Sequence, residues 1–411
     1  MASTSQAQQP VRAGEPTTRT AALAMFALLL VAYTLMAADR YLISMLGTDI
    51  REALSLSLPQ MGTLTTTFTL GIAIAGLPSS ALIARTSRRT VLLLGIALFS
   101  VATLLFTQAT GFASMFVFIV MQGAGMSFLA TSMFALSASY FSKTRVAALG
   151  IVNVCFGLGS FLGPWAIGNI QSKTDVGAWQ PPMIIFGLTG VGLAILCALL
   201  VRSWFTETKR AAEHGEDAGG ADSLINRNTL IFSVLSVLYG LTVYGWLGLY
   251  PTFLRDVVNL TPAQVGGVMP FFGLGSLTAF FAGQLGDRFP TKVILSSASL
   301  VLVVLGFFLY LPDLSIVTYK IMALLVGIFG AAIVYTNLTG GHMKSLRHSL
   351  ANKGSSMFIT TMYAGGALGG LMMGSMVASW GWGVAGQIQV SLLSLLSVLL
   401  VFGIRPSEFS K

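Results

Sequence analysis

Long apolar runs dominate this sequence and limit what it can fold into. A helix needs about 20 apolar residues to cross the hydrocarbon core of a bilayer, and twelve runs bounded by charge, Pro or Gly approach or exceed that length. They cover residues 21–46, 59–84, 90–108, 113–139, 146–170, 182–204, 229–254, 263–286, 292–311, 316–340, 355–379 and 383–404. The sequence therefore predicts an all-α integral membrane protein with twelve transmembrane helices.

The scarcity of charge supports the same fold class. Only 9% of the 411 residues are charged and 55% are hydrophobic, whereas soluble globular proteins carry roughly 25% charged residues. Charged side chains keep a protein surface wetted, so this composition excludes a water-soluble globule. The strict alternation of apolar and polar residues that is typical of membrane β-barrels is absent from the runs.

The basic residues predict the orientation, because cytoplasmic loops are enriched in Lys and Arg. If the N-terminus is cytoplasmic, 18 of the 23 Lys and Arg residues fall on the cytoplasmic side. The outer loops then hold only Arg51, Lys173, Arg255 and Lys320. We expect a multi-pass protein of the inner or plasma membrane with both termini cytoplasmic. This placement accounts for the net charge of +9 without a nucleic-acid partner.

Polar segments divide the chain into two halves. Residues 1–20 are polar and lack the apolar core of a signal peptide, so we expect a disordered cytoplasmic tail. A charged, Gly-containing segment at 205–228 reads as a cytoplasmic linker between a first six-helix bundle, 21–204, and a second, 229–404. Residues 405–411 form a second cytoplasmic tail.

The two halves also repeat one another weakly. The segment Ser80–Arg89 is matched 203 residues later by Gly283–Lys292, and Gly150 is matched by Gly354 at an offset of 204. Pseudo-symmetric halves are typical of transporters that rock two bundles about a central site. The sequence thus favours two pseudo-symmetric six-helix bundles.

These repeats resemble the signature G-x-L-[AG]-D-R-x-G-R-[RK] of the major facilitator superfamily of secondary transporters, and the resemblance covers about 21–405. The second copy keeps most of the motif, whereas the first has Ser80, Ala84 and Ser87 at three motif positions. The resemblance implies a latch that closes the cytoplasmic side. Its residues here are Arg85, Arg88, Arg89, Gly283, Asp287, Arg288 and Lys292. Because Ala84 replaces the acid, we expect weaker stabilisation of the outward-open state.

The fifth run carries Gly150, Gly159, Gly163 and Pro164 in the spacing G-x8-G-x3-G-P. Small residues let helix backbones approach closely, and Pro bends a helix, so close packing alone explains the pattern. The same spacing resembles a motif of proton-driven antiporters. Both interpretations stay open at this point.

The first run contains the adjacent pair Asp39 and Arg40, which is similar to the Asp-Arg pair in the first helix of the anion:cation symporter family. The segment Tyr250–Leu254 is similar to that family's W-[FL]-P-x-[YFW]-[LF]. The resemblance implies import of a small organic anion together with protons.

A charge at membrane depth costs several kcal/mol unless it faces water or a partner, so Asp39 and Arg40 are the strongest site candidates. On a helix of about 1.5 Å per residue they lie about 9 Å from the midpoint of the first run. Adjacent helical residues do not face each other. We therefore expect Arg40 to bind a substrate carboxylate and Asp39 to carry the proton. The alternative is a solvated pair at the membrane interface.

Six further residues are substrate-binding candidates because they are polar or aromatic and lie on helices that line the cavity in this superfamily. They are Tyr33, Gln122, Tyr244, Tyr335, Asn337 and Tyr363. A wider set of the same kind comprises Ser127, Thr131, Asn153, Tyr239 and Trp246. Any one of them alone is as well explained by helix packing. Rich in aromatics, the set favours an organic acid with an apolar or ring-like body.

Other chemistries find no support in the motifs. No phosphate-binding loop or nucleophile element is present, and Cys155 and Cys197 lie in apolar runs as small hydrophobes. The three histidines map to cytoplasmic loops or helix ends, where we expect them to be solvated. The sequence predicts a monomeric, proton-coupled importer of a small organic anion without cofactor, metal or enzymatic activity. A proton-driven exporter of apolar or drug-like compounds is the alternative, and a membrane sensor or membrane enzyme remains a different class.

Overall fold

The computed structural model of the protein describes residues 16–141, 145–175, 177–207, 220–347 and 350–409. Over these residues the chain is helical, and its one β contact is an isolated bridge between Ala221 and Leu346. Ten helices in this part of the chain are long and apolar enough to cross a membrane. The predicted all-α membrane fold is confirmed.

The first half of the chain contains nine helices among the described residues. They are α1 (Pro16–Asp39), α2 (Leu42–Met45), α3 (Gly47–Ala53), α4 (Leu58–Arg85), α5 (Arg88–Phe106), α6 (Phe112–Tyr140), α7 (Arg145–Gln171), α8 (Gln180–Leu200) and α9 (Ser203–Thr206). Helix α1 begins inside the segment for which we predicted a disordered tail, and residues 1–15 lie outside the described part.

The second half continues from α10 with the same helical character. Its elements are α10 (Arg227–Asp256), α11 (Pro262–Val268), α12 (Pro270–Ser276), α13 (Ala279–Arg288), α14 (Thr291–Phe308), α15 (Ile316–Leu325), the π-helix η2 (Val326–Val334), α16 (Tyr335–Lys344), α17 (Ala351–Gly386), the π-helix η4 (Gln387–Leu392), α18 (Leu393–Val401) and the short 3₁₀ turn η5 (Pro406–Glu408). The middle of the predicted linker, 208–219, lies outside the described residues.

Three of the twelve predicted runs explain why ten spans rather than twelve meet the length criterion among the described residues. The eighth run is divided into α11, α12 and α13, and α12 begins at Pro270, which has no N–H to continue a helical ladder. The eleventh and twelfth runs are joined through Gly381, whose backbone (φ 78°, ψ 169°) is not helical. A left-handed φ of this kind is readily adopted only by glycine.

Equivalent local signals begin α4 and α11. Ser57 caps α4 and Thr261 caps α11, and each exchanges hydrogen bonds with a glutamine three residues later in a capping box. The two caps are 204 residues apart, the offset found between the repeated glycines. The internal repeat therefore includes the residues that cap the first turns of these two helices.

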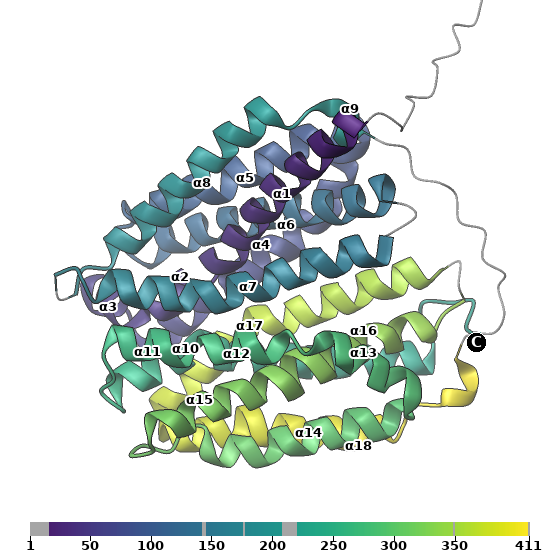
Figure 1. Cartoon of the computed structure of the whole chain (residues 1–411). Coiled ribbons are helices and arrows are strands. Elements are labelled where there is room, and N and C mark those ends of the chain that lie inside the picture. Colours follow the sequence, from purple (N-terminus) through teal and green to yellow (C-terminus); the bar gives the residue numbers. More distant parts are fainter. Residues whose placement is uncertain (1–15, 142–144, 176, 208–219, 348–349, 410–411) are drawn as a thin grey trace, which may run out of the picture.

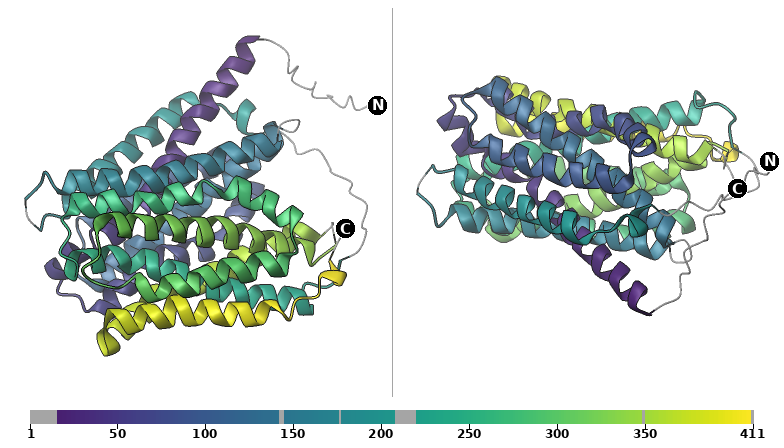
Figure 2. Two further views of the ribbon diagram at one scale, coloured as in Figure 1. Left: turned by 60° about the horizontal axis from the view of Figure 1, so that its bottom comes forward. Right: turned by 90° about the horizontal axis from the view of Figure 1, so that it is seen from above.

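The two halves lie side by side along their length (Figure 1). The first and last described turns lie at one end of the bundle, together with α9 (Figures 1 and 2). We call this the terminal end, and the end that carries α3 and α11 the opposite end. The halves meet where α4 packs on α17, where α7 packs on α11 and α12, and where α10 approaches α2, α3 and α4.

Glycines show where the α4–α17 seam is tight. A Cβ added to Gly62 would lie 2.1 Å from the carbonyl oxygen of Gly370, so the two backbones are in direct contact. Gly76 lies fourteen residues further along α4 on nearly the same face, about 21 Å toward the terminal end. A Cβ there would meet nothing within 4 Å.

The seam between α7 and α12 follows the same trend. A Cβ on Gly157 would lie 2.3 Å from Leu277 of the other half, whereas a Cβ on Gly150, one heptad nearer the terminal end, would meet nothing within 4 Å. Both seams are thus closely packed toward the opposite end and open toward the terminal end.

Candidate functional site

The first apolar run is interrupted at the predicted charged pair. Helix α1 ends at Asp39, residues 40 and 41 form a turn in which the Tyr41 N–H donates to the Ala38 carbonyl at 3.2 Å, and α2 begins at Leu42. The interruption lies within a single candidate membrane span, Arg19–Met45. Asp39 and Arg40 therefore sit at a break in a membrane helix.

Asp39 is buried in the first half, with 1% of its surface exposed. The Thr103 hydroxyl of α5 lies 2.9 Å from Oδ2 and 3.1 Å from Oδ1, and the Gln122 amide of α6 donates to Oδ2 at 2.7 Å. All these donors are neutral. The carboxyl group is thus held by hydrogen bonds rather than by an ion pair, and its burial argues against the solvated-pair alternative.

Arg40 points away from Asp39, into the interface between the halves. Its Nη2 donates to the Tyr244 hydroxyl at 3.2 Å. The guanidinium carbon lies 4.9 Å from the ring centroids of both Phe68 and Phe156 and 6.0 Å from that of Tyr244. Cation–π contacts of this kind stabilise a guanidinium without neutralising it. Among the described residues, no carboxylate lies within ion-pair distance of Arg40.

Two glycines of the fifth run bring α7 against the end of α1. A Cβ on Gly159 would lie 2.4 Å from the Thr34 carbonyl oxygen, and one on Gly163 would lie 2.7 Å from the Cα of Ala38. Pro164 lies inside α7 directly after the second contact. Gly150, the first glycine of the motif, makes no such contact. The motif thus fixes the backbone next to Asp39 through two of its three glycines.

Aromatic rings from several helices gather around Arg40. Tyr244 of α10 lies 5.8 Å from Tyr363 of α17, and Tyr239 lies 6.2 Å from Tyr335 of α16, measured between ring centroids. On the first half, Tyr33 lies 6.4 Å from Phe156. We call Tyr33, Phe68, Phe156, Tyr239, Tyr244, Tyr335 and Tyr363 the aromatic cluster. Tyr335 is 38% exposed, whereas Tyr33, Tyr239 and Tyr244 are buried.

Two predicted substrate-binding residues lie elsewhere. Gln122 is bonded to Asp39 inside the first half and does not reach the aromatic cluster. Asn337 donates to the Ile333 carbonyl at 2.9 Å and packs so tightly on Gly286 that a Cβ there would lie 2.2 Å from its Oδ1. The structure therefore gives Gln122 a place beside the proposed proton site and Asn337 a helix-packing contact.

The predicted latch residues of the first half contact their own half. The backbone N–H groups of Arg88 and Arg89 donate to the Glu207 carboxylate at 3.3 and 3.0 Å. The Arg89 side chain donates to the carbonyls of Val201 at 2.8 Å and Ala198 at 2.6 Å, at the end of α8. Arg85 is exposed.

The second-half copy behaves in the same way. Lys292 donates to the Phe402 carbonyl at 3.0 Å within the second half. Arg288 is exposed, and the nearest atom to a Cβ on Gly283 is 3.9 Å away, on Thr336 of the same half. The side chain of Asp287 lies outside the described part. In this structure these contacts do not join the halves, in keeping with the open seams at the terminal end.

His342 does not follow the expectation for the histidines. It is fully buried in α16, with its Nε2 3.2 Å from the Ser236 hydroxyl and rings of Phe232 and Phe358 beside it. Our prediction of a solvated loop residue was wrong because α16 continues through this position and packs on α10 and α17. His214 and His348 lie outside the described residues. The described His, Cys, Asp and Glu side chains form no group suited to a metal ion.

Three contacts of the pair were missed from the sequence. Phe68 and Phe156 flank Arg40, and Thr103 holds Asp39, yet each belongs to a residue type that is common in apolar membrane helices. The chain contains 27 Phe residues, so no single one stands out. For Thr103 the available signal was a polar residue within the third run, which it shares with Ser100 and Thr107.

Comparisons with known proteins agree with this architecture. Residues 29–370 match the Major Facilitator Superfamily. The chain is 28% identical over 277 residues to solute carrier family 22 member 18 of Mus musculus, covering 64% of this chain and 65% of that protein, slightly less than two thirds of its length. It is 22% identical to the hexuronate transporter of Bacillus subtilis, covering 64% and 65%. It is 25% identical to a multidrug resistance protein B homologue of Mycobacterium tuberculosis, covering 62% and 46%.

Solved structures share the fold at low sequence identity. A bacterial homologue of the human lysosomal transporter Spinster, in an inward-facing and unoccupied conformation, superposes with a TM-score of 0.75 at 17% identity, covering 95% of this chain and 96% of that one. A D-xylose-proton symporter gives a TM-score of 0.73 at 12% identity, covering 94% and 98%. Since the family match spans most of the chain and the fold agrees, this protein belongs to the Major Facilitator Superfamily of membrane transporters.

Proposed function

We propose that the protein imports a small organic anion together with protons, with Arg40 as the anion-binding residue and Asp39 as the proton-binding residue. The observation that carries the proposal is the state of Arg40. It is a cation within a membrane span, at the interface between the two halves, that faces aromatic rings and a tyrosine hydroxyl instead of a carboxylate.

A cation in such a place favours an anionic ligand. Ionisable groups at membrane depth are costly unless they meet a partner or water, and a planar guanidinium matches a carboxylate through two parallel hydrogen bonds. One Nη group is engaged by Tyr244, which leaves the other donors of the fork for a ligand. The flanking rings favour a substrate whose body is apolar or planar.

The surroundings of Asp39 suit a group that gains and loses a proton. When ionised, it accepts bonds from Thr103 and Gln122. When protonated, it acquires one donor of its own, and the hydroxyl and the amide oxygen nearby are both able to accept it. Because the partners of Asp39 are neutral, proton uptake leaves no cation without a partner. In an ion pair with an arginine, protonation of the acid would leave the arginine unpaired.

The break in α1 offers a physical route for coupling. Asp39 and Arg40 are adjacent at this break but face opposite sides, so the charge of each is sensed by a different part of the bundle. Protonation of Asp39 and binding of an anion to Arg40 remove both charges. Neutralising them lowers the cost of moving α1 against its neighbours during alternating access.

The orientation and direction rest on further observations. The excess of basic residues at the terminal end favours a cytoplasmic location for that end, and the open seams then correspond to an inward-facing state. The Spinster homologue of the same fold is described as inward-facing. Among the relatives, the hexuronate transporter is named for a sugar acid, and the xylose symporter of the same fold is named for protons.

Reconstituted proteoliposomes provide the test. An inward proton gradient is expected to drive accumulation of a labelled carboxylate chosen from a thermal-shift screen of mono- and dicarboxylates, sugar acids and aromatic acids, because a ligand that binds the folded state stabilises it. Asp39→Asn should abolish gradient-driven accumulation while anion exchange remains measurable. Accumulation by Asp39→Asn at the rate of the unchanged protein would refute the proton role.

The alternative is a proton-driven exporter of apolar or drug-like compounds. The aromatic cluster and the glycine motif of α7 favour it, and one relative is named as a multidrug resistance homologue. The same proteoliposomes separate the two functions. An exporter would expel an aromatic cation or neutral dye in exchange for protons that enter down their gradient. Arg40→Gln would leave that activity intact.

A further inference from the structure

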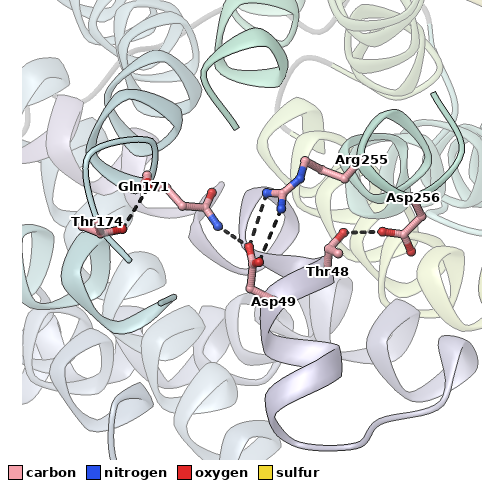
Figure 3. Close-up of polar contacts among 6 residues, drawn as sticks. All are labelled: Thr48, Asp49, Gln171, Thr174, Arg255 and Asp256. Atoms are coloured by element: carbon pink, nitrogen blue, oxygen red, sulfur yellow. Dashed lines mark hydrogen bonds and ion pairs between the residues drawn. The ribbon is translucent and has the colours of Figure 1, made fainter. Parts of the chain in front are cut away.

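Six polar side chains meet at the opposite end of the bundle, away from Asp39 and Arg40, and Figure 3 draws all of them except Arg51. Helix α3 supplies Thr48, Asp49 and Arg51, the end of α7 supplies Gln171, and the end of α10 supplies Arg255 and Asp256. Helices α3 and α7 belong to the first half and α10 to the second. The cluster therefore joins the two halves.

The first ion pair of the cluster is largely buried. Arg255 places Nη1 3.3 Å from Oδ2 of Asp49 and Nη2 3.4 Å from Oδ1, so the guanidinium approaches the carboxylate with two nitrogens. The side chains are 17% and 5% exposed. Gln171 donates its amide to the same carboxylate from α7 (Figure 3). Asp49 of α3 is thus bonded to α7 of the first half and to α10 of the second half.

The second ion pair lies beside the first and runs in the reverse direction. Arg51 of the first half places Nη2 2.8 Å from Oδ2 of Asp256 in the second half. The Thr48 hydroxyl donates to the other oxygen, Oδ1, at 2.7 Å. Both carboxylates of the cluster therefore have both oxygens engaged by residues of other helices.

The two arginines of the cluster are related by the internal repeat, whereas Asp49 and Asp256 are not at equivalent positions. Arg51 and Arg255 are 204 residues apart, the offset of the internal repeat, and each pairs with an acid of the other half. Around them the seam is closely packed, since a Cβ on Gly47 would lie 3.0 Å from the Thr252 hydroxyl of α10. The paired charges thus lie in a closely packed part of the contact between the two halves.

We propose that Thr48, Asp49, Arg51, Gln171, Arg255 and Asp256 form a lock that closes the opposite end and is released in each transport cycle. A permanent seam is well served by apolar packing, because buried ion pairs carry a desolvation cost that packing avoids. In a seam that opens to water, each charge regains its hydration. Paired charges therefore stabilise the closed state, and in the open state they present a surface that water can hydrate.

The release of the lock is measured by the accessibility of one cysteine. Thr65 of α4 is buried against Gly248 of α10, across the seam and on the central side of the lock. The reporter is Thr65→Cys in a background with Cys155→Ala and Cys197→Ala, which removes both native thiols. The full-length protein is labelled in proteoliposomes with a membrane-impermeant maleimide.

The lock variants reverse one charge at a time in the less buried pair. Arg51→Asp and Asp256→Arg each place like charges together, and like-charge contact at an interface strongly disfavours association. We expect each to raise the labelling rate of the reporter about tenfold. The double variant Arg51→Asp with Asp256→Arg restores an attractive pair and should return the rate to near its starting value. Glu52→Gln changes an exposed acid on the same helix and is the matched control.

Each outcome decides for or against the lock. Single variants that label at the rate of Glu52→Gln would overturn it, and so would a double variant that labels as fast as the singles. If a reversed variant does not fold, Asp49→Asn removes one charge without adding repulsion and should raise labelling by a smaller factor; no increase counts against the proposal. Labelling needs no substrate, so a failure of the proposed anion import leaves this test unaffected.

Discussion

Arg40 and Tyr244 are 204 residues apart, which places them at equivalent positions of the two halves, and their side chains hydrogen-bond across the interface at 3.2 Å. The same offset relates the two arginines of the lock and the capped starts of α4 and α11. At the centre, however, the two halves contribute unlike groups. The first half supplies a cation and the second a hydroxyl, so the proposed anion site is asymmetric although the internal repeat relates the two halves.

Tyr244→Phe is expected to weaken anion binding without changing the fold. The variant keeps the ring beside Arg40 and removes only the hydroxyl that orients the guanidinium. A hydrogen bond to a charged group contributes about 1.5–3 kcal/mol, so we expect the KM for the transported anion to rise by about tenfold or more. Proteoliposome uptake measures it. Tyr310→Phe, which changes a buried tyrosine outside the aromatic cluster, is the control, and equal effects of both variants would contradict a specific role for Tyr244.

Thr103→Val should alter the dependence of transport on pH. The substitution keeps the side-chain shape but removes a donor from Asp39, which favours the protonated carboxyl over the ionised one. The proton is then released only at higher pH, so the pH at which uptake falls to half should move toward alkaline values. Uptake measured across a pH series checks this. Ser100→Ala removes another buried hydroxyl of α5, one that bonds its own helix, and should leave the profile in place.

Gly62→Ala is expected to disturb the seam at the opposite end. Its Cβ would lie 2.1 Å from the Gly370 carbonyl oxygen, and overpacking of this kind typically costs about 1–3 kcal/mol. We expect a lower thermal unfolding midpoint and faster labelling at Thr65→Cys. Gly76→Ala, on nearly the same face of α4 but in open space, is the matched control. A midpoint for Gly62→Ala equal to that of Gly76→Ala would show that the seam is not tight.

Gly163→Ala separates the two interpretations of the glycine motif. The Cβ would meet the Ala38 backbone at 2.7 Å and push α7 away from the break in α1. If close packing explains the motif, both stability and transport should fall, in either direction of transport. Gly150→Ala carries the same change at the first motif glycine, where there is open space, and should have little effect. A loss of transport with unchanged stability at both positions would instead favour a role in antiport.

The sequence determined the class of this protein through properties that act over long stretches. Bilayer thickness sets the length of an apolar run and desolvation excludes charge from it, so the helical membrane fold and the exceptional position of Asp39 and Arg40 are visible without any structure. The internal repeat is equally readable, because equal folds place glycines and helix caps at equal offsets.

Only the tertiary structure decided which side chains meet. Periodicity along one helix does not say how that helix is rotated against its neighbours. It therefore could not reveal that Gln122 turns toward Asp39 rather than Arg40 or that His342 is buried. The sequence predicted only an outer-loop position for Arg255 and no role for Asp49, because their partnership spans 206 residues. Contacts between the halves depend on the packing of whole bundles, and that information is distributed over every helix of the chain.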